Sequence, residues 1–204
     1  MGSPDKYKYF LLYKPFGFLS QFTKEIPEHQ CLSDLKLDIP KDCFPVGRLD
    51  KDSEGLLLLS NHGKLNNLLL DPKHEQSKTY YAQVEGAITM EAVQQLKKGV
   101  KIKLKTGTYQ TKPCQANLLT TEPNLPERNP PIRYRKSIPT SWVSIQITEG
   151  KNRQVRKMCA AVGFPVLRLV RVAIKDLKAS NLQPGELLSL SKTKIEEKLG
   201  LKLN

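Results

Sequence analysis

The sequence of 204 residues is poor in the residue patterns that build disulfide or metal sites. Its four cysteines form no Cys-x-x-Cys pair, and its three histidines do not fall at metal-ligand spacings. We therefore expect free thiols in a reducing compartment, and no metal site. The N-terminus lacks the features of a signal peptide, and no apolar run approaches the length of a membrane span. These absences predict a cytoplasmic protein without a membrane partner.

Acidic residues are also scarce relative to basic ones. Lys and Arg number 33 against 20 Asp and Glu, which gives a net charge of +13 and a pI near 9.6. An excess of this size indicates a polyanionic partner, with nucleic acid first and an anionic membrane surface second. A solubilising bias of the surface is the plain alternative. The hydrophobic share, 39%, is ordinary for a globular chain that buries a core.

The hydrophobic pattern predicts more strands than helices. Alternating or continuous apolar runs predict strands over 9–13, 56–59, 78–85, 143–147, 167–173 and 187–190. Helical spacing predicts helices over 64–70, from Thr89 to Gly99, and from Val155 to Gly163. Residues 100–120 are expected to form strand, turn and strand. Strands and helices in no regular alternation predict an α+β fold, with a mixed, mostly antiparallel central sheet flanked by helices.

A polar loop before the strand at 56–59 holds three carboxylates, Asp50, Asp52 and Glu54. Polar loops on a rigid scaffold often carry catalytic groups, although a solvated turn has the same composition. Paired carboxylates also suit a hydrolase of glycosidic bonds. In that case Asp52 or Glu54 would be as essential as Asp50, and free base would be released.

The Gly-Arg-Leu-Asp block that ends at Asp50, followed by Ser-Glu-Gly and four leucines, resembles the signature of the pseudouridine synthases. It is most similar to the ribosomal small-subunit pseudouridine synthase A type family. The resemblance implies that Asp50 is the catalytic nucleophile. It also implies that Arg48 lies beside the RNA, where it fills the gap left by a flipped base.

Two later blocks follow in the order of that family. Lys78-Thr79-Tyr80 resembles its second motif, whose Tyr stacks on the target uracil. Strand alternation places Tyr80 on the inward face, a position that core packing alone would also explain. Residues 149–158 resemble the third motif, which implies an ion pair between Arg156 and the catalytic Asp. The strand around Leu169 resembles the one that packs an aliphatic side chain against the base.

The resemblance spans about residues 9–190. It implies a catalytic domain over 1–190, built as two sub-domains that share one sheet with a cleft between them, and a C-terminal tail over 191–204. Residues 21–23 and 128–142 resemble the branch of large-subunit synthases of type E. That branch implies a uridine in the peptidyl-transferase region of 23S rRNA as the target. Many relatives carry an N-terminal S4 RNA-binding module, and we expect none here.

Basic residues supply the expected RNA contacts. Five prolines and several cations make 121–141 an extended basic loop. Phosphate contacts are expected from this loop, from the third motif and from the following strand, at Arg128, Arg133, Arg135, Lys136, Lys151, Arg153, Lys157, Arg168 and Arg171. The isomerisation gains and loses no atom, so we expect no cofactor, and we expect a monomer. A non-catalytic RNA-binding protein is the rival that also explains the charge.

Overall fold

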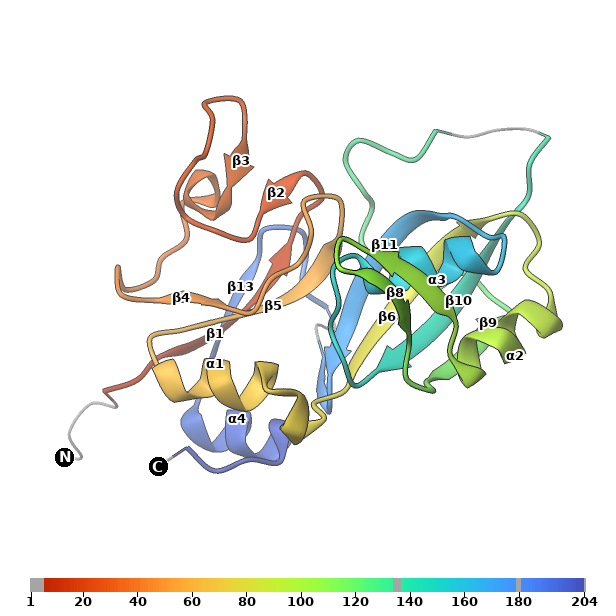
Figure 1. Ribbon diagram of the computed structural model, residues 1–204. Helices are drawn as coiled ribbons and strands as arrows, with labels where there is room; N and C mark the ends of the chain where they lie inside the picture. Colours follow the sequence, from red (N-terminus) through yellow and green to blue (C-terminus); the bar gives the residue numbers. More distant parts are fainter. Residues whose placement is uncertain (1–5, 134–136, 179–180, 204) are drawn as a thin grey trace.

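The computed structural model describes residues 6–133, 137–178 and 181–203 (Figure 1). Within these residues, a nine-stranded sheet has the strand order β13-β1-β5-β11-β6-β10-β9, with β4 paired to β5 and β12 paired to β11. The bounds of its strands are β1 Tyr9–Lys14, β4 Phe44–Val46, β5 Glu54–Ser60, β6 Lys78–Glu85, β9 Gln115–Leu119, β10 Thr140–Ile147, β11 Val166–Ile174, β12 Leu177–Lys178 and β13 Leu187–Leu190.

The sheet is mixed, and its pairs are mostly antiparallel. Among its described strands, β5 and β11 run parallel over a short contact, and the other neighbours are antiparallel. The α+β class predicted from the sequence is therefore confirmed. At the β5–β11 contact Gly55 has a φ of +99°, and a Cβ there would lie 2.4 Å from the backbone oxygen of Arg171. Glycine is required because the two strands approach closely at this point.

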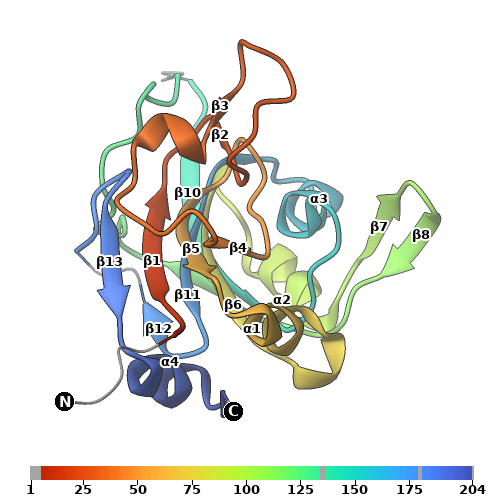
Figure 2. The ribbon, with the colours of Figure 1, turned by 90° about the vertical axis from the view of Figure 1, so that its left-hand side faces the viewer.

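Four helices flank the sheet in the described part of the chain: α1 Gly63–Leu70, α2 Met90–Lys98, α3 Gln154–Ala161 and α4 Lys192–Leu199. Figure 2 shows α3 and the hairpin of β7 (Lys101–Leu104) and β8 (Gly107–Gln110) on the same side of the sheet. The helices α2 and α3 cover one apolar core, whereas α1 and α4 cover a second. None of these described helices has the length and apolar character needed to cross a bilayer.

Two segments differ from the sequence-based expectation. Residues 100–120 contain three strands, because β9 follows the expected hairpin and pairs with β10. In the segment expected as a tail, residues 191–203 are described; they form α4 and bury Ile195, Leu199 and Leu203 in the second core. Ser191 caps this helix by accepting a hydrogen bond from the backbone of Lys194. The C-terminal segment is therefore packed against the body of the protein.

Candidate active site

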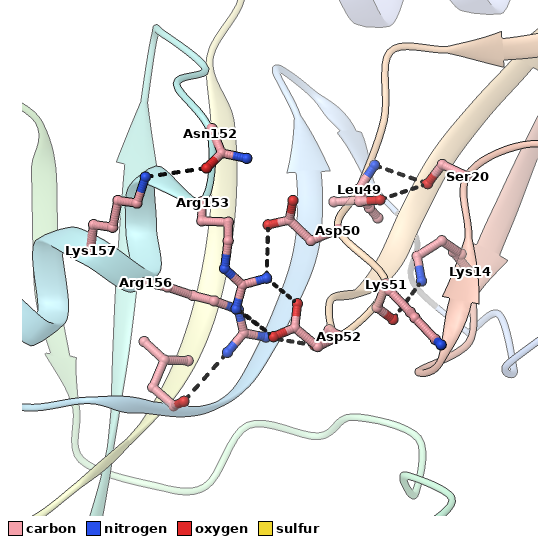
Figure 3. Close-up of polar contacts among 11 residues, drawn as sticks. Lys14, Ser20, Leu49, Asp50, Lys51, Asp52, Asn152, Arg153, Arg156 and Lys157 are labelled. Carbon is pink, nitrogen blue, oxygen red and sulfur yellow. Dashed lines mark hydrogen bonds and ion pairs between the residues drawn. The ribbon is translucent and has the colours of Figure 1, made fainter. Parts of the chain in front are cut away.

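The loop between β4 and β5 is anchored on both sides of Asp50 (Figure 3). Ser20 Oγ accepts a hydrogen bond from Leu49 N at 3.0 Å and donates one to Leu49 O at 2.9 Å. Lys14 is fully buried, and its Nζ donates to the Lys51 carbonyl at 3.4 Å and to two neighbouring carbonyls. Burial lowers the pKa of Lys14 to about 7. These contacts hold the carboxylate-bearing loop in one position.

A cavity of about 570 Å³ opens beside this loop. Arg48 and Asp50 from the loop, Tyr80 from β6 and Leu169 from β11 all line it. Tyr80 is half-buried and packs against the core formed in part by its strand neighbours Ala82 and Val84, as the alternation predicts. Four of the five residues expected at the catalytic centre are thus brought together from three segments that are far apart in the sequence.

Arginine side chains from the third motif lie over the carboxylates of this loop. Arg153 donates two hydrogen bonds to the carboxylate of Asp52, at 2.8 and 2.7 Å, and its Nη1 lies 3.9 Å from Oδ2 of Asp50. Arg153 immediately precedes α3 in the left-handed region, at φ 51° and ψ 35°. That backbone conformation is strained for a residue with a side chain, and such strain is common at functional sites.

The ion pair that the resemblance implied for Arg156 differs in the structure. Arg156 makes its ion pair with Asp52, at 3.4 Å, rather than with Asp50, and it donates to the backbone carbonyl of Asp52 as well. The reason is that Arg153 occupies the space between Asp50 and the start of α3 (Figure 3). The two arginines and two carboxylates form one balanced cluster in which Arg153 is the contact of Asp50.

Arg168 and Arg171 also differ from the expectation of an exposed phosphate-contacting surface. Both are buried, with 8% and 5% of their surface exposed. Arg168 donates two hydrogen bonds to Glu54, at 2.9 and 2.8 Å, and Arg171 Nε donates to the carbonyl of Leu56 at 2.8 Å. Their strand, β11, lies in the middle of the sheet, so neither side chain is on the exposed surface, although Arg171 lines the cavity.

The remaining cations expected to bind RNA lie nearer the surface. Arg133, Lys151 and Arg153 are exposed, whereas Arg128 and Lys157 are partly exposed. The guanidinium of Arg128 lies over the ring of Phe16, 4.1 Å from its centroid. Arg135 and Lys136 lie outside the described residues. Of the five described cations, Lys151 and Arg153 line the cavity, and Arg153 is already engaged by the carboxylate of Asp52.

Comparisons with known proteins agree with this geometry. A sequence model of the family described as RNA pseudouridylate synthase matches residues 8–161. The chain belongs to the RNA pseudouridylate synthase family. A relative from Xanthomonas axonopodis pv. citri, named ribosomal large subunit pseudouridine synthase E, is 50% identical over 175 residues, which is 85% of this chain and 89% of that one.

More distant pseudouridine synthases also match most of the chain. A protein of the same name from Vibrio vulnificus is 46% identical over 90% of this chain and 75% of its own. A solved structure described as a pseudouridylate synthase superposes with a TM-score of 0.76 at 26% identity, over 95% of this chain and 74% of that one. The fold of this chain is therefore the pseudouridine synthase fold.

Two charged residues at this candidate site of the pseudouridine synthase are not identified by the sequence patterns. Lys78 lines the cavity, and burial together with the charge of Arg171 lowers its pKa to about 8. The signal was present, since Lys78 stands two positions before Tyr80 and therefore shares its strand face. Glu149 is buried and accepts hydrogen bonds from Tyr109, from Gln154 and from the backbone of Lys112. Its partners lie up to 40 residues away, so spacing alone does not reveal them.

Proposed function

We propose that this chain isomerises a specific uridine of ribosomal RNA to pseudouridine, with Asp50 as the nucleophile and without a cofactor. One observation carries the proposal. Asp50, Tyr80 and Leu169 line a single cavity, although they come from a loop and two different strands. The names of the similar proteins support rRNA as the substrate, and the resemblance to the type E branch supports the peptidyl-transferase region of 23S rRNA.

The target base must leave its stack before the enzyme reaches it. Extrusion of a base costs a few kcal/mol. Stacking on an aromatic side chain returns about 1–3 kcal/mol, and Tyr80 offers such a surface, with Leu169 as an apolar contact in the same cavity. Arg48 is exposed at the mouth of the cavity and fills the space that the base vacates. The three side chains together offset the cost of extrusion.

Asp50 then acts on the extruded uridine as an ionised carboxylate. It attacks the sugar or the base covalently, or it removes the 2′ proton, and each route requires the charged form. Arg153 places a positive charge 3.9 Å from the carboxylate of Asp50. Arg156 acts through Asp52, which orients the guanidinium of Arg153 beside Asp50. The isomerisation conserves every atom of the uridine, so these residues suffice for the proposed chemistry.

The test uses unmodified 23S rRNA fragments with tritium at C5 of uridine. We expect tritium release and pseudouridine without free base, and we expect Asp50→Asn to abolish both while RNA binding is retained. Asp38→Asn is the matched control, because Asp38 is exposed on another part of the surface and should leave the activity unchanged. Activity that survives in Asp50→Asn refutes the mechanism. Release of free base identifies a hydrolase, and binding without turnover identifies a non-catalytic RNA-binding protein.

A second test concerns the basic loop. Arg128→Ala together with Arg133→Ala removes two cations, so the slope of log affinity against log salt should become shallower by about 1.4 to 1.8. The measurement is RNA affinity at several salt concentrations, with Lys41→Ala together with Lys202→Ala as an exposed control pair. An unchanged slope removes this loop from the RNA surface.

Because one chain lines the whole cavity and the substrate is rRNA, we also propose a monomer that works in the cytoplasm.

A further inference from the structure

A second cavity, of about 650 Å³, lies on the other face of the sheet. Its floor includes Thr79 and Tyr81, which alternate along β6 with Lys78 and Tyr80 of the candidate active site. Because successive side chains of a strand point to opposite faces, the two cavities lie on opposite faces of β6. Arg171 lines both cavities, at the short junction of β5 and β11.

The rim of this cavity is fixed by buried contacts. Asn124, Leu125 and Pro126 form one side of it, and they begin the basic loop between β9 and β10 (Figure 1). The Pro126 carbonyl accepts a hydrogen bond from Arg168 Nη2 at 2.7 Å, and Arg168 is held in turn by the carboxylate of Glu54. A buried ion pair therefore holds this side of the rim against the sheet, so the cavity is part of the folded structure.

The lining of this cavity carries positive charge. Among the described residues that line the cavity, three are cationic and none is acidic. Lys175 donates to the carbonyl of Leu199, whereas Lys178 is exposed and makes no ion pair with a described residue. Arg171 Nη2 is buried and has no hydrogen-bond partner. The cavity thus offers positive charge that the described part of the chain does not neutralise.

Uncharged groups of this lining suit a base. Tyr81 is half-buried and presents an aromatic ring. Asn124 and Asn181 stand on the rim, and their side chains make no hydrogen bond to any described residue. An amide side chain carries both donors and acceptors, as the edge of a base does. The volume also falls within the range of about 300–1,000 Å³ that is usual for ligand cavities.

We propose that this second cavity binds a nucleotide, with the base against Tyr81, the amides of Asn124 and Asn181 at its edge, and the phosphate at Lys178. The site does not involve Asp50 and goes beyond the proposed function. The nucleotide has two possible sources, which share this chemistry. One source is a nucleotide of the bound RNA strand, which would run along the basic loop. The other source is a free mononucleotide.

The test compares nucleotide stoichiometry in two variants. Asn124→Ala together with Lys178→Glu alters the second cavity without touching the first, and Lys41→Glu is a control with the same reversal of charge on an exposed lysine. Isothermal titration with each of the four ribonucleoside 5′-monophosphates should show one bound equivalent fewer in the double variant than in the control. Equal stoichiometry in the two proteins for all four nucleotides overturns the proposal.

Competition with RNA then distinguishes the two sources of the nucleotide. If a residue of the RNA fills the cavity, an unmodified rRNA fragment displaces the extra nucleotide, and the double variant binds that fragment about tenfold more weakly than the control. If a free nucleotide fills it, the nucleotide stays bound beside the RNA and the two affinities are equal. Tritium release measured in parallel tests the proposed function separately, because the double variant keeps Asp50 and its cavity.

Discussion

The buried ion pair between Glu54 and Arg168 makes a quantitative prediction about stability. The side chains are 1% and 9% exposed, and two hydrogen bonds of 2.9 and 2.8 Å join them. The perturbations are Glu54→Gln, Arg168→Met and the double variant. The Gln side chain keeps the shape of the carboxylate but not its charge, and the Met side chain keeps the apolar stem of the arginine.

Each single substitution leaves one buried charge, or one buried polar group, without its partner. Removal of one member of a buried pair costs about 3–5 kcal/mol of the free energy of unfolding. The double variant leaves no charge behind, although the Pro126 carbonyl still loses the hydrogen bond from Arg168, which costs about 1–3 kcal/mol. We therefore expect the double variant to be at least as stable as the less stable single variant, with a coupling energy of about 2 kcal/mol or more.

Urea denaturation provides the assay, since the single tryptophan, Trp142, is buried and reports unfolding by fluorescence. An exposed pair, Lys112 and Glu75, serves as the control, because surface pairs contribute about 0–1 kcal/mol. A coupling energy for Glu54 and Arg168 as small as that of the control pair refutes the reasoning. A second readout is proteolysis of the basic loop, which should become faster in both Arg168 variants.

Three further predictions concern Gly55, Lys14 and the pH dependence of stability. Gly55→Ala should lower the free energy of unfolding by about 3 kcal/mol or more, because its φ is positive and the Cβ meets backbone, whereas Gly63→Ala, with open space around it, should be neutral or stabilising in the same urea assay. Lys14→Met should lower both the urea midpoint and the turnover number, because three carbonyl oxygens, one of them on the loop of Asp50, lose their hydrogen bond from the lysine. An unchanged turnover number contradicts the anchoring role. Burial lowers the pKa of Lys14 to about 7 and of Lys78 to about 8, so above pH 7 the unfolded chain binds more protons than the folded chain and the urea midpoint should rise from pH 7 to pH 9. Lys78→Met should reduce that rise, and a midpoint that falls over this range contradicts the prediction.

The predicted rise of stability with pH ends near pH 9, because other buried groups then titrate in the unfolded chain. Burial raises the pKa of the Cys114 thiol to about 11 and of the Cys159 thiol to about 12, and it raises the pKa of the Tyr13 phenol to about 12. Above pH 9 the unfolded chain loses these protons and the folded chain keeps them, so stability falls as the pH rises further. The lysines and the thiols together predict a maximum of stability on the alkaline side of neutrality.

Local patterns predicted most of the fold. The strand at 78–85 was placed at its observed bounds because one face is buried and the alternation is therefore regular. The strand β9 was missed because its pattern is short and Ala116 is its one fully buried side chain. The packing of α4 was also missed, since its buried residues, Ile195 and Leu199, contact a core whose other members lie throughout the chain. Such contacts follow from the tertiary structure and leave a weak local signal.

The residues of the candidate site were predictable to the extent that each lies in a motif. Asp50 and Tyr80 lie in separate motifs, and the fold brings both to one cavity. The partners of the arginines were not predictable, because charge alone does not distinguish a surface arginine from a buried one. Arg168 pairs with Glu54 across 114 residues of sequence, and Arg153 reaches Asp52 across 101. Those distances are set by the topology of the sheet.

The partners of the neighbouring carboxylates bear on the rival hydrolase. Such an enzyme needs a second carboxyl group with a raised pKa that acts as an acid. Partial burial raises the pKa of Asp52, but the hydrogen bonds from Arg153 and the charge of Arg156 outweigh this effect and hold the pKa below its ordinary value. Glu54 is buried against Arg168 and is not part of the cavity lining. Asp50 is therefore the one carboxylate of its loop that lines the cavity and carries no direct hydrogen bond from an arginine, which supports the proposal that it is the nucleophile.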